Sequence, residues 1–314
     1  MVCHGEFGIQ STRLWGFVKL SEIDNIVNTY YRIKHELKII RWRFRRNAAA
    51  LHWGRSELET MPAVLGNAMP KSGSHLIIQV LHGLTSLGPF VKTGFPPVNR
   101  SEDNQKLPQE DVLENIRSML QGDIAYGYIH ACEPYIEALT GPHKATIFVY
   151  RDPRDMIVSH VFYATEMHKG HGMHPYYTEV LDSTEKRIDA QILGVEEPGF
   201  ELSCVKTKYE AYLGWLAQPN VLCIRFEDLI LNRVEVLGVI LDYLAQLGFT
   251  PSVTRREAIE TLTSAIAPRK SGTFRKGKPG NWREHFSQEN INHFKEATGD
   301  LLVRLGYEQN ADWV

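Results

Sequence analysis

A lysine, two serines and a glycine stand together in the stretch NAMPKSGSHLIIQVLHGL, between two apolar runs. The preceding run, residues 63–69, has the length of a buried strand, and the following run has the spacing of a helix. A loop of this kind exposes several backbone N–H groups at a helix start, where they bind a phosphate. Lys71 comes before Gly73, so the order differs from that of a Walker A sequence. Taken alone, the stretch fits a phosphate-binding loop and a plain turn equally well.

The segment VYRDPRDMIVSH offers a second anion-binding position. Arg151 ends an apolar run and Ser159 follows on the next helical pattern, so both are expected at the carboxyl edge of a sheet, where ligands bind in open α/β folds. An arginine and a serine placed in this way suit a phosphate remote from the first one. The alternative interpretation is an arginine paired with Asp152 or Asp155 on the surface.

Two further segments are rich in turn-forming residues. The stretch TFRKGKPGNWREHF combines glycines with Arg275, Lys276 and Lys278, and its side chains and backbone could wrap an anion. The alternative is a solvated basic loop. A final helix is expected around residues 291–305. The Pro-rich segment 92–111 is expected to be a long loop, which is typical of a functional lid or of disorder.

Three short apolar runs predict the sheet. They lie at 63–69, 145–150 and 221–226, and each is followed by a helical pattern. We expect buried parallel strands in βα units. Pro153 is expected at the first helical position, behind Asp152 as N-cap. The predicted fold class is α/β, a single three-layer domain with a central parallel sheet and a P-loop-like anion-binding loop.

Composition excludes several classes of protein. The chain has 314 residues, is 43% hydrophobic and 23% charged, and carries a net charge of −2, so a globally basic nucleic-acid binder is excluded. No apolar run approaches the roughly 20 residues of a membrane span, and the N-terminus lacks the apolar segment of a signal peptide. The scattered cysteines favour a reducing compartment, and we expect a cytoplasmic protein. These cysteines are Cys3, Cys132, Cys204 and Cys223.

We expect residues 1–60 to be an N-terminal extension and residues 61–314 to be the main domain. The extension contains the basic helical pattern YYRIKHELKIIRWRFRRNAAA. One interpretation is weak contact with an anionic membrane surface, or with an acidic partner, through residues 30–46. The favoured interpretation is a solvated helix whose apolar side chains pack on the main domain. These side chains are Ile33, Leu37, Ile40 and Phe44.

Four short motifs along the chain can be explained together, because they occur in the order found in one known family. They lie at residues 70–76, 151–159, 226–228 and 275–286. With them the chain resembles the soluble, cytosolic and bacterial type of sulfotransferase that uses PAPS (3′-phosphoadenosine 5′-phosphosulfate). The resemblance covers roughly residues 60–308. It implies transfer of a sulfuryl group from PAPS to a hydroxyl, or less often an amine, of a small-molecule, lipid or carrier-bound acceptor, giving PAP.

The resemblance also implies which residues hold the nucleotide. The 5′-phosphosulfate would be bound by Lys71, Ser72, Gly73, Ser74 and His75. The 3′-phosphate would be bound by Arg151, Ser159, Arg275, Lys276 and Gly277. Leu76 and Phe226 would lie against the adenine. The sequence departs from the family pattern at His75, where a Thr is usual, at Leu76, where a Trp is usual, and at Asn281, where an Asp is usual.

The same resemblance places the catalytic residues. Lys71 would stabilise the charge that develops on the bridging oxygen. Ser159 is also expected among the catalytic residues. A base must take the acceptor proton, and the segment AYGYIHACEPY offers Tyr128 and His130. We favour His130 because an imidazole titrates near neutral pH whereas a free phenol has a pKa of roughly 10. The alternative is that Tyr128 occupies the base position and His130 is a core histidine.

Three alternatives remain open at this point. His168, His171 and His174 raise the question of a metal site, but the glycines among them disfavour a regular helix, and we expect a substrate-side loop and no metal. A P-loop kinase is disfavoured because no Walker A sequence is present. A PAP-binding pseudo-enzyme with the same fold is the alternative to a working sulfotransferase. The identity of the acceptor and the oligomeric state are not predicted.

Overall fold

Five parallel strands form the centre of the protein in the spatial order β2-β3-β1-β4-β7. A computed structural model describes residues 20–267 and 277–313, with side chains from residue 29 onward. The central β1 pairs with β3 on one side and with β4 on the other. The strands are β1 (Ala63–Ala68), β2 (Val91–Lys92), β3 (Asp123–Gly127), β4 (Lys144–Tyr150) and β7 (Val221–Arg225). The predicted parallel strands at 63–69, 145–150 and 221–226 are therefore confirmed.

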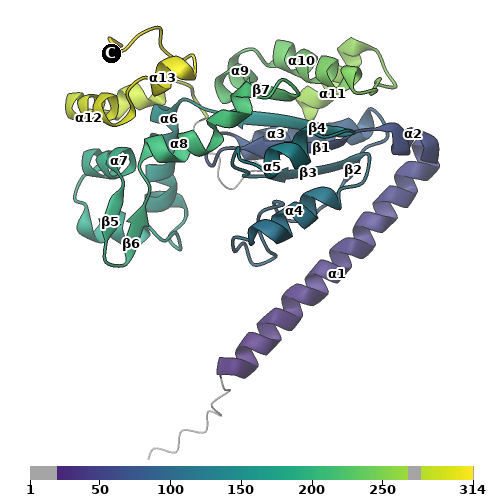
Figure 1. The fold of residues 1–314 in the computed structure, drawn as a ribbon, viewed down its shortest axis with the longest axis horizontal. Helices are drawn as coiled ribbons and strands as arrows, with labels where there is room; N and C mark the ends of the chain where they lie inside the picture. The colour runs from purple at the N-terminus through teal and green to yellow at the C-terminus, as the bar shows by residue number, and fades with distance from the viewer. Residues whose placement is uncertain (1–19, 268–276, 314) are drawn as a thin grey trace, which may run out of the picture.

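Helices cover both faces of this sheet (Figure 1). Residues of β1 alternate between two hydrophobic clusters, with Val64 and Ala68 in one and Leu65 and Met69 in the other. The first cluster contains the apolar faces of α3 (Ser74–Gly83), α10 (Arg233–Gln246) and α11 (Arg255–Ala265). The second contains those of α4 (Gln109–Arg117), α5 (Tyr135–Thr140), α6 (Pro153–Phe162), α8 (Val205–Leu213) and α12 (Gln288–Thr298). The prediction of a three-layer α/β domain is confirmed.

The remaining elements are short. They are α2 (Arg55–Thr60), α7 (Thr184–Leu193), β5 (Val195–Glu197), β6 (Phe200–Leu202), α9 (Phe226–Leu231) and α13 (Leu301–Arg304). The predicted cap of α6 is confirmed, because the Asp152 side chain accepts a hydrogen bond from the Arg154 N–H and Pro153 opens the helix. The predicted single helix at 291–305 is wrong. It is divided into α12 and α13 because Gly299 adopts a positive φ of 58°.

Helix α1 (Leu20–Trp53) extends from beside α2 as a long arm (Figure 1). The expectation that its apolar side chains pack on the main domain is wrong, because Ile33, Leu37, Ile40 and Phe44 are all exposed. The polar side of the helix makes the contact instead, since the buried carboxylate of Asp123 accepts hydrogen bonds from the side chains of Trp42 and Arg46. Among the described helices, none has both the length and the apolar character needed to cross a bilayer.

Candidate functional site

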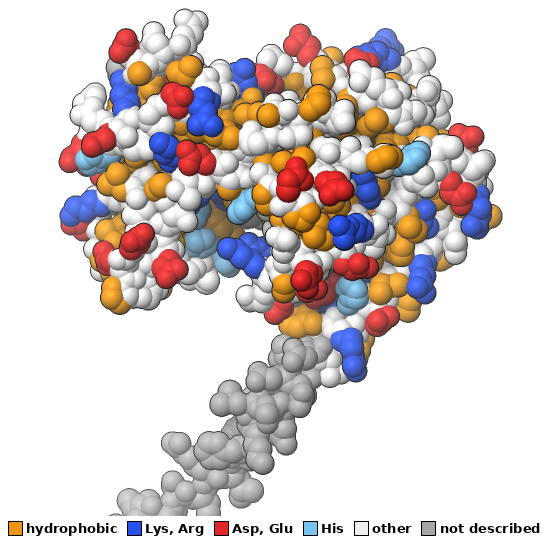
Figure 2. Space-filling view, viewed as in Figure 1, with side chains coloured by type: hydrophobic (Ala, Val, Ile, Leu, Met, Phe, Trp, Pro, Cys, Tyr) orange, Lys and Arg blue, Asp and Glu red, His pale blue; other side chains and the backbone are white. Residues whose placement is uncertain are grey.

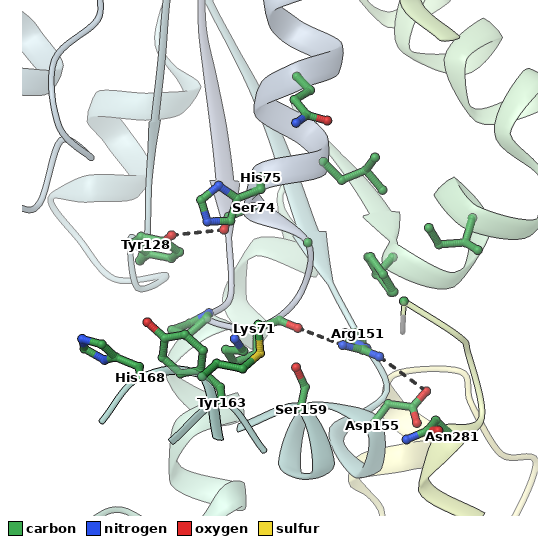
Figure 3. Close-up of a pocket in the computed structure, with 18 of the residues that line it drawn as sticks. Lys71, Ser74, His75, Tyr128, Arg151, Asp155, Ser159, Tyr163, His168 and Asn281 are labelled. Carbon is green, nitrogen blue, oxygen red and sulfur yellow. Dashed lines mark hydrogen bonds and ion pairs between the residues drawn. The ribbon is translucent and has the colours of Figure 1, made fainter. Parts of the chain in front are cut away.

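A pocket of about 410 Å³ opens at the carboxyl ends of β1 and β4 (Figure 3). The strand order runs outward in opposite directions from this point, with β3 and β2 on one side and β7 on the other. Ligands of open parallel sheets bind at such a switch point, where the loops on either side diverge and leave a crevice. The loop after β1 carries Lys71 and the loop after β4 begins with Arg151. The fold therefore brings two cations that are distant in sequence to one crevice.

The loop between β1 and α3 has an unusual backbone. Lys71 adopts a positive φ of 64°, which is uncommon for a residue with a side chain and is typical of strained functional loops. Gly73 has a φ of 90°, and a Cβ atom at this position would clash with the ring of Phe226. The backbone N–H groups of Gly73 and of the first helical residues Ser74 and His75 donate no hydrogen bond to any described residue. These N–H groups at the start of α3 are available to an anion.

The Lys71 side chain lies over an aromatic ring. Its Nζ is 3.7 Å from the centre of the Tyr163 ring, which lies in the π-helical turn that follows α6. Burial, and to a smaller extent the nearby positive charge of Arg151, together lower the pKa of Lys71 to about 8. An anion that enters the pocket favours the charged form of Lys71, because its attraction to the ammonium group offsets both effects.

Arg151 is buried beside this lysine. Its Nη1 donates to the carbonyl oxygen of Lys71 at 3.2 Å, and its guanidinium lies 4.6 Å from the centre of the Phe226 ring. Its Nη2 is 4.0 Å from the Asp155 carboxylate. Because both side chains are buried, the alternative of an ion pair on the surface is wrong. Its Nε has no hydrogen-bond partner among the described residues. The arginine therefore keeps a buried donor for a ligand.

Asp155 connects α6 to the C-terminal part of the pocket. Its carboxylate accepts hydrogen bonds from the backbone N–H of Gly280 at 2.7 Å and of Trp282 at 2.8 Å. These bonds place Gly277 and Asn281 in the pocket wall opposite Lys71. The Asp155 carboxylate thus anchors the backbone of residues 280–282, which follow the glycine-rich loop.

The charges in the pocket favour an anionic ligand. The described lining residues include a single carboxylate, Asp155, which is already occupied by two backbone N–H groups. Figure 2 shows a hollow on one face of the molecule, with histidine and basic side chains gathered at it. The cationic residues of the lining are Lys71, Arg100, Arg151, Arg233 and Lys278. An excess of this kind in a partly buried cavity suits a ligand with several negative charges.

The two candidate bases lie on the segment that follows β3. The Tyr128 hydroxyl lies 3.1 Å from the Ser74 Oγ, and the side chain of Asn99 hydrogen-bonds to both the N–H and the C=O of Tyr128. His130 is exposed, and its ring lies 4.9 Å from that of Tyr212. It is not among the residues that line the pocket, whereas Tyr128 is. The two candidates that the sequence left open are thus placed differently.

Histidines line the outer part of the same side. His168 and His171 face the pocket, and the Met173 N–H donates to the Nδ1 of His171 at 3.1 Å. Burial lowers the pKa of His171, and an Nδ1 that accepts this bond leaves the ring proton of the neutral form on Nε2. His174 instead lies 2.7 Å from the carbonyl oxygen of Ala164. Within the part of the chain that the structure describes, no three His, Cys, Asp or Glu residues form a potential metal site.

Most of the residues expected from the sequence meet in this pocket. Ser72 lies beneath the loop, fully buried, and its Oγ has no partner among the described residues. Arg275 and Lys276 lie outside the described residues. The expected residues that line the pocket are Lys71, Gly73, Ser74, His75, Leu76, Tyr128, Arg151, Ser159, Phe226 and Gly277.

Other lining residues were not expected. Tyr163 and Arg100 belong to none of the sequence motifs described above. Tyr163 reaches the pocket from the π-helical turn after α6, and Arg100 reaches it from the Pro-rich loop. The position of Asp155 could have been predicted from the sequence. It lies four residues after Arg151 at the start of a predicted helix, and residues at this spacing lie on the same face. Asn104 joins Arg100 from the same loop, whose Arg100 and Lys106 form a short antiparallel bridge.

Comparison with known proteins gives this architecture a family. A model of the sulfotransferase domain matches residues 62–306. The mouse sulfotransferase SULT7A1 complexed with PAP shares 17% identity, with a TM-score of 0.52 over 81% of this chain and 89% of that chain. Retinol dehydratase in a complex with retinol and PAP shares 14% identity, with a TM-score of 0.50 over 78% of this chain and 84% of that one. At such identities the structures show a shared fold. No curated protein sequence matches the chain.

Proposed function

The chain belongs to the sulfotransferase domain family and is a PAPS-dependent sulfotransferase, and from that premise we propose that its acceptor is a hydroxyl of a small molecule bound beside Tyr128. The observation that carries the proposal is the position of the Tyr128 hydroxyl, 3.1 Å from Ser74 at the start of α3. This contact joins the side of the pocket that receives an acceptor to the loop that receives the phosphosulfate. The pocket also includes Arg100, Asn104 and His168, which are not among the residues expected to hold the nucleotide and are available to an acceptor.

The described residues fit the nucleotide. The free N–H groups at the start of α3, with Lys71 beside them, suit the 5′-phosphosulfate. The buried Nε of Arg151 and the hydroxyl of Ser159 suit the 3′-phosphate, and Figure 3 shows both side chains directed at the same space. Phe226, largely buried beneath Arg151, lines the pocket together with Leu76, and the two side chains form the wall against which the adenine would lie. The two sulfotransferase-fold proteins named above were both crystallised with PAP, which supports this arrangement.

Lys71 supplies the charge that the reaction needs. When the sulfuryl group leaves PAPS, negative charge grows on the oxygen that bridged sulfur and phosphorus. An ammonium group already held in place by the Tyr163 ring stabilises that charge without reorganisation. Because the charge is largest in the transition state, Lys71 contributes mainly to the rate and less to binding.

Tyr128 and Ser74 form the path for the acceptor proton. In this path the Tyr128 oxygen accepts the acceptor O–H while its own proton is donated to the Ser74 Oγ, which is one of the two directions that their 3.1 Å contact allows. As the new O–S bond forms, the acceptor proton moves to Tyr128, and the tyrosine proton moves through Ser74 toward the phosphate group that becomes PAP. The pair thereby transfers one proton without requiring a free tyrosinate.

The experiment is a paired measurement of PAP binding and sulfuryl transfer. We expect PAP to bind in a calorimetric titration, and PAPS to yield PAP with at least one member of a panel of phenols, aliphatic alcohols and amines. Turnover with hydroxyl acceptors and none with amines supports the acceptor class. Turnover with amines alone overturns it. PAP binding without turnover on any acceptor would support the pseudo-enzyme instead.

A further inference from the structure

Helix α1 carries an uncovered apolar seam along its length. Seven positions repeat at alternating intervals of three and four residues, which is the heptad spacing of a coiled coil. The six apolar side chains among them are between 47% and 89% exposed. In heptad notation the a positions are Tyr30, Leu37, Phe44 and Leu51, and the d positions are Ile33, Ile40 and Asn47.

The main domain occupies the opposite side of the same helix. Trp42 and Arg46 donate to Asp123, Arg45 donates to the carbonyl oxygens of Lys92 and Thr93, and Lys38 pairs with Glu102. These helix residues hold heptad positions b, c and f, which face away from the a/d seam. One longer contact, from Lys34 to Glu102 at 3.7 Å, comes from an e position at the border of the seam. The domain therefore holds the helix by its outer side and leaves the seam directed away from itself. Figure 1 shows the N-terminal part of α1 extending away from the sheet, whereas the C-terminal part of the helix reaches β2 through the Arg45 contacts.

We propose that this seam is the interface with a second copy of the chain, and that the two α1 helices form a parallel, in-register coiled coil. The seam is self-complementary, as a two-fold interface requires, because each a or d layer meets the same layer of the other copy. The two domains then lie on the outer sides of the helix pair, where their contacts with b, c and f positions are undisturbed.

Charges beside the seam select the parallel arrangement. In a parallel pair, a g position faces the e position five residues later on the partner, so Glu36 faces Arg41 of the other copy, and two-fold symmetry repeats the pair. The other g positions, Thr29 and Arg43, face Lys34 and an alanine, so no pair of like charges is created. An antiparallel pair would bring arginines or lysines of the e positions together.

The flanking residues also limit the number of helices. Leucine at a with isoleucine at d by itself favours bundles of more than two helices. Here the e and g positions include Lys34, Glu36, Arg41 and Arg43, which a larger bundle would bury. Asn47 is a single polar residue in the seam, a feature that fixes register at a cost in stability. A membrane-bound helix presents a wider apolar face than this narrow stripe.

The first test is the mass of the full chain in solution. Light scattering after gel filtration, from 1 to 100 µM, should give the mass of two chains. The variant Leu37→Glu/Ile40→Glu should be a monomer with unchanged helix content, since glutamate is a good helix former. The matched control Leu193→Glu/Val239→Glu changes two exposed apolar residues elsewhere and should stay dimeric. A wild-type monomer at 100 µM, or a dimer that persists in the seam variant, overturns the proposal.

The second test measures direction and register. Ile40→Cys should form a disulfide between two copies of residue 40 under mild oxidation, identified by peptide mass mapping, whereas Arg32→Cys at an exposed c position should not. Glu36→Arg should raise the dimer dissociation constant about tenfold, and adding Arg41→Glu should restore it. A dimer that is not cross-linked at residue 40, or whose charge swap restores nothing, overturns the parallel register. A monomer that sediments with vesicles of phosphatidylcholine and phosphatidylserine would show a membrane surface instead.

Discussion

The two ends of the pocket are built in different ways. The end expected to hold the nucleotide is formed by residues that closely follow strands, with Arg151 directly after β4, Phe226 directly after β7 and Lys71 three residues after β1. The end next to Tyr128 is formed by loops and by the π-helical turn that contains Tyr163. Strand ends are fixed by the sheet, whereas loops depend on contacts from distant parts of the chain. We therefore expect changes at the first end to affect any substrate equally, and changes at the second to depend on the acceptor.

The largest effect is expected at Lys71. Lys71→Met keeps the length of the side chain and removes its charge, and should lower kcat by about 10²–10³-fold with little change in PAP affinity. Steady-state kinetics and calorimetry give the two quantities. Lys278→Met is the matched control, because Lys278 also lines the pocket but is exposed and paired with Glu284. A Lys71 variant that raises KM alone would contradict a role in the transition state.

The next effect separates the two candidate bases. Tyr128→Phe should lower kcat by roughly 10²-fold, because the acceptor proton loses its path to Ser74, while PAP still binds. His130→Ala should cost less than fivefold, because His130 does not line the pocket. Tyr163→Phe is the control for a lost hydroxyl, since its ring remains under Lys71. The reverse order, with His130→Ala inactive and Tyr128→Phe active, would return the base to His130 and make the rate rise with pH as its imidazole becomes neutral.

The third prediction concerns the 3′-phosphate. Arg151→Met and Ser159→Ala should each weaken PAPS by about tenfold or more, and neither should weaken APS, which lacks that phosphate. The ratio of kcat/KM for the two nucleotides is the measurement, so a general loss of stability cancels. Arg100→Met, an arginine at the acceptor end, should leave the ratio unchanged. Equal losses for PAPS and APS would place the 3′-phosphate elsewhere.

The two ends also differ in how far the sequence predicts them. Lys71, Gly73 and Arg151 could be predicted because each lies within a few residues of an apolar run whose end is fixed by the sheet. Tyr163 and Arg100 could not, because their positions depend on a π-helical turn and on a loop held by other segments. The sequence also identified the apolar side of α1, but the prediction that this side faces the main domain was wrong.

That error has a physical cause. Apolar residues at helical spacing were expected to face the domain, because burial of apolar area is the usual driving force. The domain instead presents Asp123 at the start of β3, buried and bonded to Trp42 and Arg46. A buried carboxylate left without partners is costly, so the polar side of α1 covers it and the apolar side faces outward. The hydrophobic spacing of a helix does not reveal a buried charge on the surface that it meets.

The fourth prediction is a pH dependence at the nucleotide end. Since the pKa of Lys71 is lowered to about 8, the free enzyme loses this charge as the pH rises through that value. The kcat/KM for PAPS should be constant below pH 7 and should fall tenfold for each pH unit above about 8. Lys71→Arg, which stays protonated, should remove this decline even if its overall rate is lower. A decline that persists in the arginine variant would belong to another group.

The smallest effect should appear at the acceptor end, through the loop that α1 supports. Glu102 is largely buried within this loop and lies near two lysines and a histidine of α1, namely Lys38 at 2.7 Å, Lys34 at 3.7 Å and His35 at 3.4 Å. The ring of Phe95 in the same loop lies between those of His35 and Trp42, 5.5 Å and 6.1 Å from them. These contacts hold the segment that places Arg100 and Asn104 in the pocket.

Glu102→Gln keeps the shape of the side chain and removes the ion pairs, whose worth at a partly exposed site is about 0.5–1 kcal/mol. The KM for the acceptor should therefore rise roughly two- to fivefold, while the KM for PAPS stays unchanged, because no strand end is disturbed. Glu114→Gln, an exposed carboxylate on α4, is the matched control and should change neither constant. An equal rise in both KM values would mean that the two ends of the pocket share their support, and that the difference in their construction has no functional consequence.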